Sequence, residues 1–186
     1  MGVVAVKNCD GNDVCIATAT PGSFGSGGFS VSVYVGGNNL IRGTDPGPGG
    51  SASVTFEESA ITDGPVRPGF ITFTYGPTAL NASGGATAEA AFSVGEIQGT
   101  VPGQVGIPMP AAGVPVPFGL GVAFAIQISA SFSVPSGPPS RYANAQVNLS
   151  FSLFEAESLT LADGSVSQYP GAPVAVRANV IASGAG

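Results

Sequence analysis

The stretch Val122–Val134, with the sequence VAFAIQISASFSV, alternates between two kinds of side chain. One phase, which begins with Val122, consists of valine, phenylalanine and isoleucine with Ala130, and the other contains alanines, serines and Gln127. Successive side chains of a β-strand point to opposite faces, so this pattern gives one apolar face and one small or polar face. The stretch therefore predicts a half-buried strand whose apolar phase belongs to a hydrophobic core.

The segment Tyr142–Leu153 shows the same alternation. Alanine, valine, leucine and Phe151 fill one phase, while tyrosine, asparagine, glutamine and serine fill the other. The joint 135–140, with the sequence PSGPPS, is a loop by composition. Two long alternating strands with a short joint predict an antiparallel pair.

Weaker alternation recurs along the rest of the chain, and no window favours a helix. The candidate strands are 3–6, 14–20, 29–35, 51–56, 70–75, 88–94 and 174–180. The sequence predicts an all-β, single-domain antiparallel β-sandwich or jelly-roll with eight to ten strands and long Gly/Pro-rich loops. We take 1–186 as this one domain, in which 1–8 could be a strand that is loosely attached or exchanged with a neighbouring chain.

Composition excludes several kinds of chemistry. The 186 residues include no histidine, so a Ser-His-Asp triad, a Cys-His pair and a histidine metal site are impossible. Five basic residues against eleven acidic ones give a net charge of −6, which argues against a nucleic-acid partner because phosphate binding needs a basic face. The one stretch that could pass for a membrane span, 111–128, contains prolines and glycines and passes into period-two alternation, so we expect no membrane span.

The only two cysteines, Cys9 and Cys15, enclose a short polar segment. No histidine and no third cysteine can complete a zinc site, so a local disulfide is favoured over two free thiols. Such a bond implies an oxidising compartment. Within the segment, Asp10, Asn12 and Asp13 could hold Ca²⁺ through oxygen ligands, or could form a turn by bonding their own backbone. No other cofactor is indicated.

Amide and aromatic side chains form a candidate ligand face. If the long strands present a concave surface, this face would hold Gln127, Tyr142, Asn144, Gln146 and Asn148. Amides donate and accept hydrogen bonds, and with tyrosines such as Tyr34 and Tyr169 they could bind carbohydrate. The alternative is that isolated tyrosines on a sheet pack against cross-strand neighbours. A flat face of serine and alanine would instead favour a structural role.

Glu155 and Glu157 are the strongest candidates for a catalytic pair. They lie two residues apart, so on a strand they share a face, and two carboxylates could hydrolyse a glycosidic bond. They could equally be charges that protect a strand end from aggregation. Without histidine, a neutral-pH base would have to be a perturbed carboxylate, the only lysine (Lys7) or a metal-bound water. We therefore expect no catalysis.

Two segments read as loops because they are rich in glycine and proline, namely Gly36–Gly50 and Thr100–Gly119. The second contains no charged residue. A loop of that length either crosses the end of the sandwich with its apolar residues on the core, or presents an apolar surface to another molecule. The sequence leaves both possibilities open.

The second half of the chain resembles exported bacterial proteins of the PEP-CTERM sorting class. The similar segments are VPFGLGV at 116–122, the alternating strand after it, ANAQVNLSF at 143–151 and LADGS at 161–165, about 50 residues in all. The resemblance implies a β-rich, weakly charged protein exported to the cell surface or extracellular matrix. The Val-Pro-Glu-Pro sorting tail of that class does not occur in this sequence, which ends IASGAG.

Two functions follow from these observations. The first is a non-catalytic extracellular or cell-surface β-protein with a structural or adhesive role, which could also assemble with itself into a matrix or filament. The alternative is a carbohydrate-binding module, with or without Ca²⁺. The partners we expect are further copies of the chain, other surface or matrix components, or polysaccharide. Since no signal peptide begins the sequence, we expect it to be the mature form of an exported protein.

Overall fold

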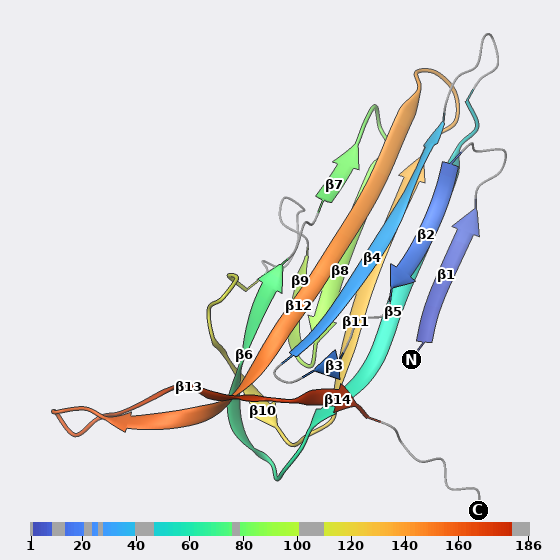
Figure 1. Cartoon of the computed structure of the whole chain (residues 1–186). Helices are drawn as coiled ribbons and strands as arrows, with labels where there is room; N and C mark the ends of the chain where they lie inside the picture. The colour runs from blue at the N-terminus through green and yellow to red at the C-terminus, as the bar shows by residue number, and fades with distance from the viewer. Residues whose placement is uncertain are drawn as a thin grey trace, which may run out of the picture.

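The computed structural model describes residues 2–8, 14–20, 24–25, 28–39, 47–75, 79–100 and 110–179. These residues form fourteen strands and no helix (Figure 1). The absence of helix within these ranges agrees with the sequence pattern. The number of strands exceeds the eight to ten expected, because several are short pieces that alternation does not reveal.

One sheet has six strands, and every pairing recorded in it is antiparallel. Its members are β1 (Gly2–Asn8), β5 (Gly50–Thr62), β8 (Thr87–Val94), β9 (Ile97–Thr100), β11 (Phe124–Val134) and β14 (Val176–Ala178). The order is β1-β5-β11-β8-β9, and β14 pairs with the far end of β5. The N-terminal strand β1 pairs with β5 over all seven of its residues.

The other sheet has eight strands and is also antiparallel in its recorded pairings. Its members are β2 (Val14–Thr20), β3 (Phe24–Gly25), β4 (Gly28–Asn39), β6 (Arg67–Tyr75), β7 (Ala79–Ala82), β10 (Val116–Leu120), β12 (Arg141–Thr160) and β13 (Val166–Val174). The path is β10-β6-β12-β4-β2, and β3, β7 and β13 attach beside it. β12, with twenty residues, is its central strand.

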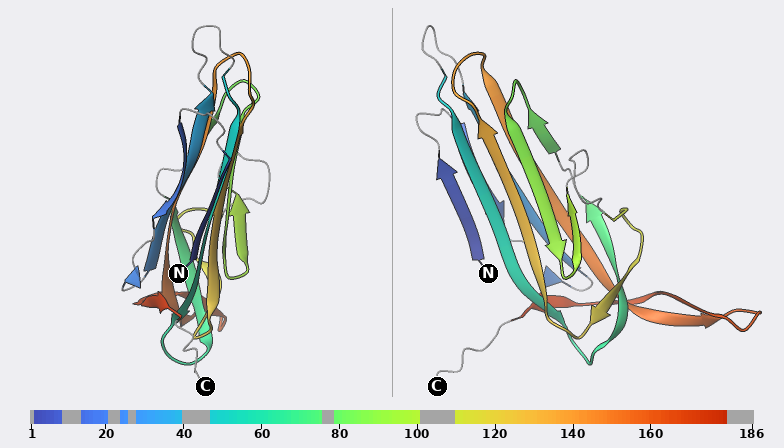
Figure 2. Two further views of the ribbon diagram at one scale, coloured as in Figure 1. Left: turned by 90° about the vertical axis from the view of Figure 1, so that its right-hand side faces the viewer. Right: turned by 180° about the vertical axis from the view of Figure 1, so that it is seen from behind.

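The two sheets pack face to face around one hydrophobic core (Figure 2). Aromatic rings join them across the interior: Phe29 of one sheet lies 6.1 Å from Phe56 of the other, and Phe73 lies 5.6 Å from Phe92. The apolar phases of β11 and β12 are buried from Phe124 and Ala143 onward, as the alternation predicted. The polar phases therefore form the two outer faces of a β-sandwich-like fold.

The predicted antiparallel pair between the two long strands is wrong. β11 pairs with β5 and β8 in the six-stranded sheet, whereas β12 pairs with β4 and β6 in the other. The joint 135–140 carries the chain from one sheet to the other. The two strands therefore face each other across the core, because each has a single apolar face to bury.

Asn39 holds this crossing in place from the end of β4. Its side chain is fully buried, and its Nδ2 donates to the carbonyl oxygens of Pro135, at 2.6 Å, and Gly137, at 3.2 Å. Its Oδ1 accepts from the backbone N–H of Arg141, where β12 begins. One buried amide side chain thus satisfies three backbone groups at the crossing, and unmet hydrogen bonds of a buried polar group are costly.

The first residue of the quoted alternation, Val122, is not in the core. Its exposed fraction is 49%, and β11 starts only at Phe124. The preceding Gly121 has φ of +76°, a conformation that favours glycine, and its N–H donates to the buried Thr62 hydroxyl at 2.7 Å. This turn places Val122 outside the sandwich, which the sequence pattern did not show.

The two predicted loops are partly strands. Residues 36–39 continue β4, and 116–119 belong to β10, whose Val116 and Phe118 pack partly against the core. Val114 is exposed. Residues 40–46 and 101–109 lie outside the described residues.

A two-stranded ribbon leaves the body of the sandwich where β12 continues beyond β6 (Figure 1). The register of β12 with β13 shifts between Phe154 and Ala156, so that Gly171 and Ala172 of β13 face one residue of β12. Such a bulge bends a ribbon and changes its direction. The ribbon ends in a hairpin turn at Asp163 and Gly164, and Asp-Gly is a residue pair that favours such turns.

Candidate functional site

The outer face of the six-stranded sheet is covered by small hydroxyl side chains, and we call it the hydroxyl face. It arises because the outward phases of three adjacent strands are rich in serine and threonine. Its hydroxyl-bearing members are Ser51, Ser53 and Thr55 of β5, Ser129, Ser131 and Ser133 of β11, and Thr87 and Ser93 of β8. The register aligns them in rows across the strands, such as Ser53–Ser131–Glu89.

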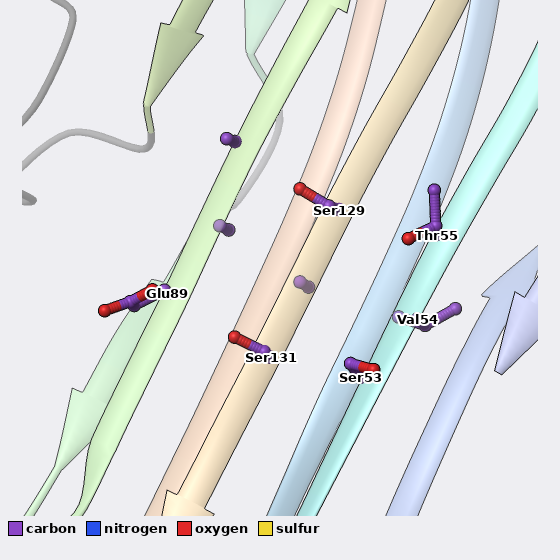
Figure 3. Close-up of a pocket in the computed structure, with 9 residues that line it drawn as sticks. Ser53, Val54, Thr55, Glu89, Ser129 and Ser131 are labelled. Atoms are coloured by element: carbon purple, nitrogen blue, oxygen red, sulfur yellow. The ribbon is translucent and has the colours of Figure 1, made fainter. Parts of the chain in front are cut away.

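The hydroxyl face is shallow. A depression of about 140 Å³ lies at its centre, where Ser53 and Thr55 come from β5, Ser129 and Ser131 from β11, and Glu89 from β8 (Figure 3). Ligand pockets for small molecules are usually about 300–1,000 Å³. The depression is smaller than that, so the centre of the face suits contact with an extended or flat partner. A larger hollow of about 510 Å³ lies at the end of the same face that carries Glu57, Ser93 and Gln127.

Two carboxylates lie on this face among the hydroxyl groups. Glu57 accepts a hydrogen bond from Gln127 Nε2 at 2.7 Å, and these two residues are also paired in the register of β5 and β11. Glu89 comes from β8 and lies opposite Ser131. The face is therefore polar and locally acidic, with donors supplied by hydroxyl groups and by the amide of Gln127.

The outer face of the eight-stranded sheet differs, and we call it the amide face. It carries Tyr34 of β4 with Tyr142, Asn144, Gln146 and Asn148 of β12. Ser32 Oγ donates to Asn148 Oδ1 at 2.5 Å, and Asn81 Nδ2 donates to Asn144 Oδ1 at 3.3 Å. The polar phase of β12 thus forms a ladder of amides that is bonded to its neighbouring strands.

Tyr34 lies across Gly36 on this face. A Cβ atom built at Gly36 would be 2.7 Å from the Tyr34 hydroxyl oxygen and 2.9 Å from Asn144 Cβ. The glycine therefore makes room for the tyrosine side chain beside the amide ladder.

The structure does not bring together all five residues of the predicted ligand face. Tyr142, Asn144, Gln146 and Asn148 share the amide face, whereas Gln127 lies on the hydroxyl face of the opposite sheet. The separation follows from the crossing between β11 and β12. Ligand binding by these residues stays a prediction.

Glu155 and Glu157 each bind a partner of their own. Glu155 is held by Arg67, whose Nε and Nη2 donate to it at 2.6–3.0 Å. Glu157 accepts from the Tyr169 hydroxyl at 2.9 Å. The hydrogen bonds from Arg67 lower the pKa of the Glu155 carboxyl below its ordinary value, against the opposing effect of burial. A general acid needs a raised pKa, so Glu155 is shifted in the opposite direction.

The Arg67–Glu155 pair gives a prediction for pH dependence. Because the folded state lowers the pKa of Glu155, its contribution to stability is complete above the ordinary pKa of glutamate, about 4.3, and is lost as pH falls through the lower, folded value. The pair is part-exposed, so we expect Glu155→Gln to cost no more than about 1 kcal/mol at pH 7. Urea unfolding of both proteins should show this difference shrinking below pH 4. A difference that grows on acidification would contradict the assignment.

The cysteine segment lies largely outside the described residues. Cys9, Asp10, Asn12 and Asp13 are not described, while Cys15 is in β2, opposite Gly37. The disulfide and the Ca²⁺ site therefore stay predictions. Since β1 belongs to one sheet and β2 to the other, a bond between Cys9 and Cys15 would tie the two sheets together at this edge.

Comparison with known proteins adds no relative. No family model matches the chain, and neither a curated protein nor a solved structure matches it.

Across the described ranges, no group of three or more acidic or cysteine side chains is arranged to hold a metal ion. The same ranges contain no helix with the length and hydrophobicity needed to cross a membrane.

Two further features were not found from the sequence. An apolar groove of about 590 Å³ lies beside Phe118 and Val122, and the hairpin ribbon exposes Leu159 and Val166. The groove joins segments that are distant along the chain, so no local pattern marks it. The exposed apolar residues of the ribbon resemble those of any half-buried strand, and only the three-dimensional structure shows that nothing in the described chain covers them.

Proposed function

We propose that this chain is a non-catalytic, extracellular or cell-surface β-protein with a structural and adhesive role. The whole chain is taken as one β-sandwich domain. The observation that carries the proposal is the hydroxyl face, where serine and threonine side chains cover adjacent strands with few large groups among them. A flat face of small side chains allows close approach of another extended surface.

Hydroxyl groups suit such contact because each one both donates and accepts a hydrogen bond. The rows across β5, β11 and β8 repeat at every second residue, so a polymer lying along β11 would meet the same groups several times. Weak contacts that repeat along one rigid face add up when they are engaged together. Matrix polysaccharide, or a second sheet of the same kind, has the matching chemistry.

The location in this proposal rests on the resemblance to exported PEP-CTERM proteins and on the expected Cys9–Cys15 disulfide. Low charge supports the same role, since only 9% of residues are charged. Glu155, which could serve a hydrolase, accepts a hydrogen bond from Arg67 instead.

The proposal is tested by adhesion of immobilised protein. Ser129 lies at the centre of the hydroxyl face and is exposed, so Ser129→Lys should leave the fold intact and place a bulky charge there. We expect at least a tenfold loss of binding to cellulose and chitin films, measured by surface plasmon resonance. The matched control is Thr74→Lys, at an exposed outward position of β6 in the other sheet.

Equal binding by wild type and Ser129→Lys would contradict the role of the hydroxyl face. A glycosidase or esterase activity that is present in the wild type and lost in Glu155→Gln/Glu157→Gln would contradict the non-catalytic assignment.

Carbohydrate binding through the amide face is the second candidate. The observation that favours it is Tyr34, which lies across Gly36 beside Asn144 and so places an aromatic side chain next to amide donors and acceptors. In that case Tyr34→Ala, and not Ser129→Lys, would abolish binding to the same films. The two variants therefore separate the two functions.

A further inference from the structure

The hairpin ribbon beyond the body of the sandwich is an apolar arm. We define the arm as Glu157–Tyr169, thirteen residues of β12, the turn and β13. Leu159, Leu161 and Val166 are 53%, 44% and 64% exposed, and Tyr169 is 41% exposed. Four large apolar or aromatic side chains are thus held in water on a short ribbon.

The arm is unusual because the rest of the described chain does not pack on it. Beyond Glu155, β12 pairs only with β13 among the described strands, so both long edges of the ribbon are open there. A two-stranded ribbon alone is marginally stable in water. An arm of this kind gains stability when another surface covers its apolar residues.

Local bonds nevertheless give the arm a defined shape. Asp163 Oδ1 accepts from the backbone N–H of Ser165 at 2.9 Å and from its hydroxyl at 2.6 Å, which fixes the turn. The Tyr169 hydroxyl donates to Glu157 across the two strands. The arm is therefore already organised for docking, which lowers the entropy cost of ordering it in a complex.

The same molecule carries an apolar groove of matching character. Ten residues line the groove, which has a volume of about 590 Å³ and lies between the β8–β9 turn, β10 and the β10–β11 turn. Phe118 and Phe124 meet edge to face at 5.1 Å, and Val122 and Ile97 add further apolar surface. Among the described residues that line the groove, Glu96 is the only charged one. β9 and β10 are edge strands of their sheets, so the groove lies at the side of the sandwich.

We propose that the arm of one copy docks in the apolar groove of a second copy, and that the exchange is reciprocal. Figure 2 shows that the arm projects from the side and end of the sandwich where β9 and β10 lie. Arm and groove together form a self-complementary surface, which is what a two-fold symmetric interface requires. From Glu157 to Leu161 the arm reaches about 13 Å beyond its base, enough to cross to a neighbouring molecule.

The size of the exchanged surface supports a second copy as the partner. One arm and one groove contribute twenty-three residues per chain. Stable protein–protein interfaces use about 20–30 residues on each side. A one-way contact would use the arm of one chain and the groove of the other only, which falls below that range. The reciprocal exchange therefore forms a closed dimer that gives the proposed surface protein its building unit.

The oligomeric state in solution tests this proposal. We expect wild-type protein to sediment as a dimer at about 10 μM, and Val166→Lys in the arm and Val122→Lys in the groove each to weaken the dimer at least tenfold. Both side chains are exposed, so neither change disturbs the core. Tyr142→Lys, an exposed residue of β12 at the opposite end of the sandwich, is the control and should remain dimeric.

A mixture of the two variants distinguishes reciprocal exchange from other contacts. Each variant alone forms no intact arm–groove contact, whereas a mixed dimer retains one, so dimers of intermediate strength should reappear on mixing. Hydrogen exchange provides a second measurement: amides of Leu159–Tyr169 should be protected more at high protein concentration in the wild type, and not in Val166→Lys.

Three results would overturn the exchange: a monomeric wild type at 100 μM, a dimer that survives both substitutions, or a dimer lost in the arm variant alone. None of them affects the adhesion test, which uses immobilised chains. Conversely, unchanged film binding by Ser129→Lys would contradict the proposed function and leave the dimer measurement valid.

Discussion

Replacing Phe151 with alanine is expected to lower the free energy of unfolding by about 3–5 kcal/mol. Phe151 lies on the apolar phase of β12 and is 2% exposed. Its ring lies 5.7 Å from Phe29 within its own sheet and 6.2 Å from Phe124 of the facing sheet. Truncation would leave a cavity at the centre of the sandwich, where the surrounding strands cannot collapse. Urea unfolding followed by circular dichroism measures the change.

Phe154→Ala is the matched control for this measurement. Phe154 lies on the same strand, but on the outer phase, and is only half-buried. The same substitution there should cost less than half as much. A loss below about 1 kcal/mol for Phe151→Ala would mean that the apolar phase of β12 faces solvent and that its register is inverted.

The second large effect is expected for Asn39→Ala, which should cost about 2–4 kcal/mol. The alanine cannot replace the hydrogen bonds to the carbonyls of Pro135 and Gly137, nor the one from the Arg141 N–H. Three part-buried backbone groups of the crossing would lose their partners, and the loss of several bonds from one network exceeds that of one. Equilibrium unfolding measures the cost, and faster hydrogen exchange at Arg141 would locate it.

Asn38→Ala provides the comparison at the adjacent position. Asn38 lies on the outward phase of β4, opposite Tyr142, and its buried side-chain oxygen has no hydrogen-bond partner among the residues that the structure describes. The same truncation is therefore expected to change stability by less than about 1 kcal/mol. Equal losses for the two variants would show that the asparagine side chain at 39 does not hold the crossing.

The buried faces of the long strands could be predicted because alternation alone decides which face is apolar. Ile126 and Ile128 on β11, and Val147 and Leu149 on β12, occupy the core as expected. A shift by one residue would move the entire apolar set to solvent. The pattern therefore contains enough information to assign inside and outside, strand by strand.

The partner of each strand could not be predicted in the same way. A joint of six residues can span about 20 Å, so it can connect either neighbouring strands about 4.8 Å apart or facing sheets about 10 Å apart. The choice between them depends on distant residues, above all Asn39, and on the neighbours that β5 and β4 provide. The alternation of apolar and polar residues does not indicate these long-range contacts.

The candidate site could not be predicted in full for the same reason, because the partner of each strand was unknown. Gln127 and Gln146 share the polar pattern of their strands, yet they lie on opposite outer faces. The hydroxyl face consists of residues from three segments that are far apart in the sequence, including Ser53, Glu89 and Ser131. The rows of hydroxyl groups depend on the register of β5, β11 and β8, and the sequence does not show which strands pair.

β1 and β14 both pair with β5, so the two ends of the described sheet lie close together. Both run antiparallel to β5, and Ala178 pairs with Ala60 while Gly2 pairs with Glu57. The end of β14 and the start of β1 thus stand three positions apart along β5, a gap of about 10 Å. A short linker could join them into one continuous edge strand. The two strand ends are thus close enough for circular permutation. A circular permutant opened at an exposed turn such as Gly84–Gly85 would keep every paired strand in place.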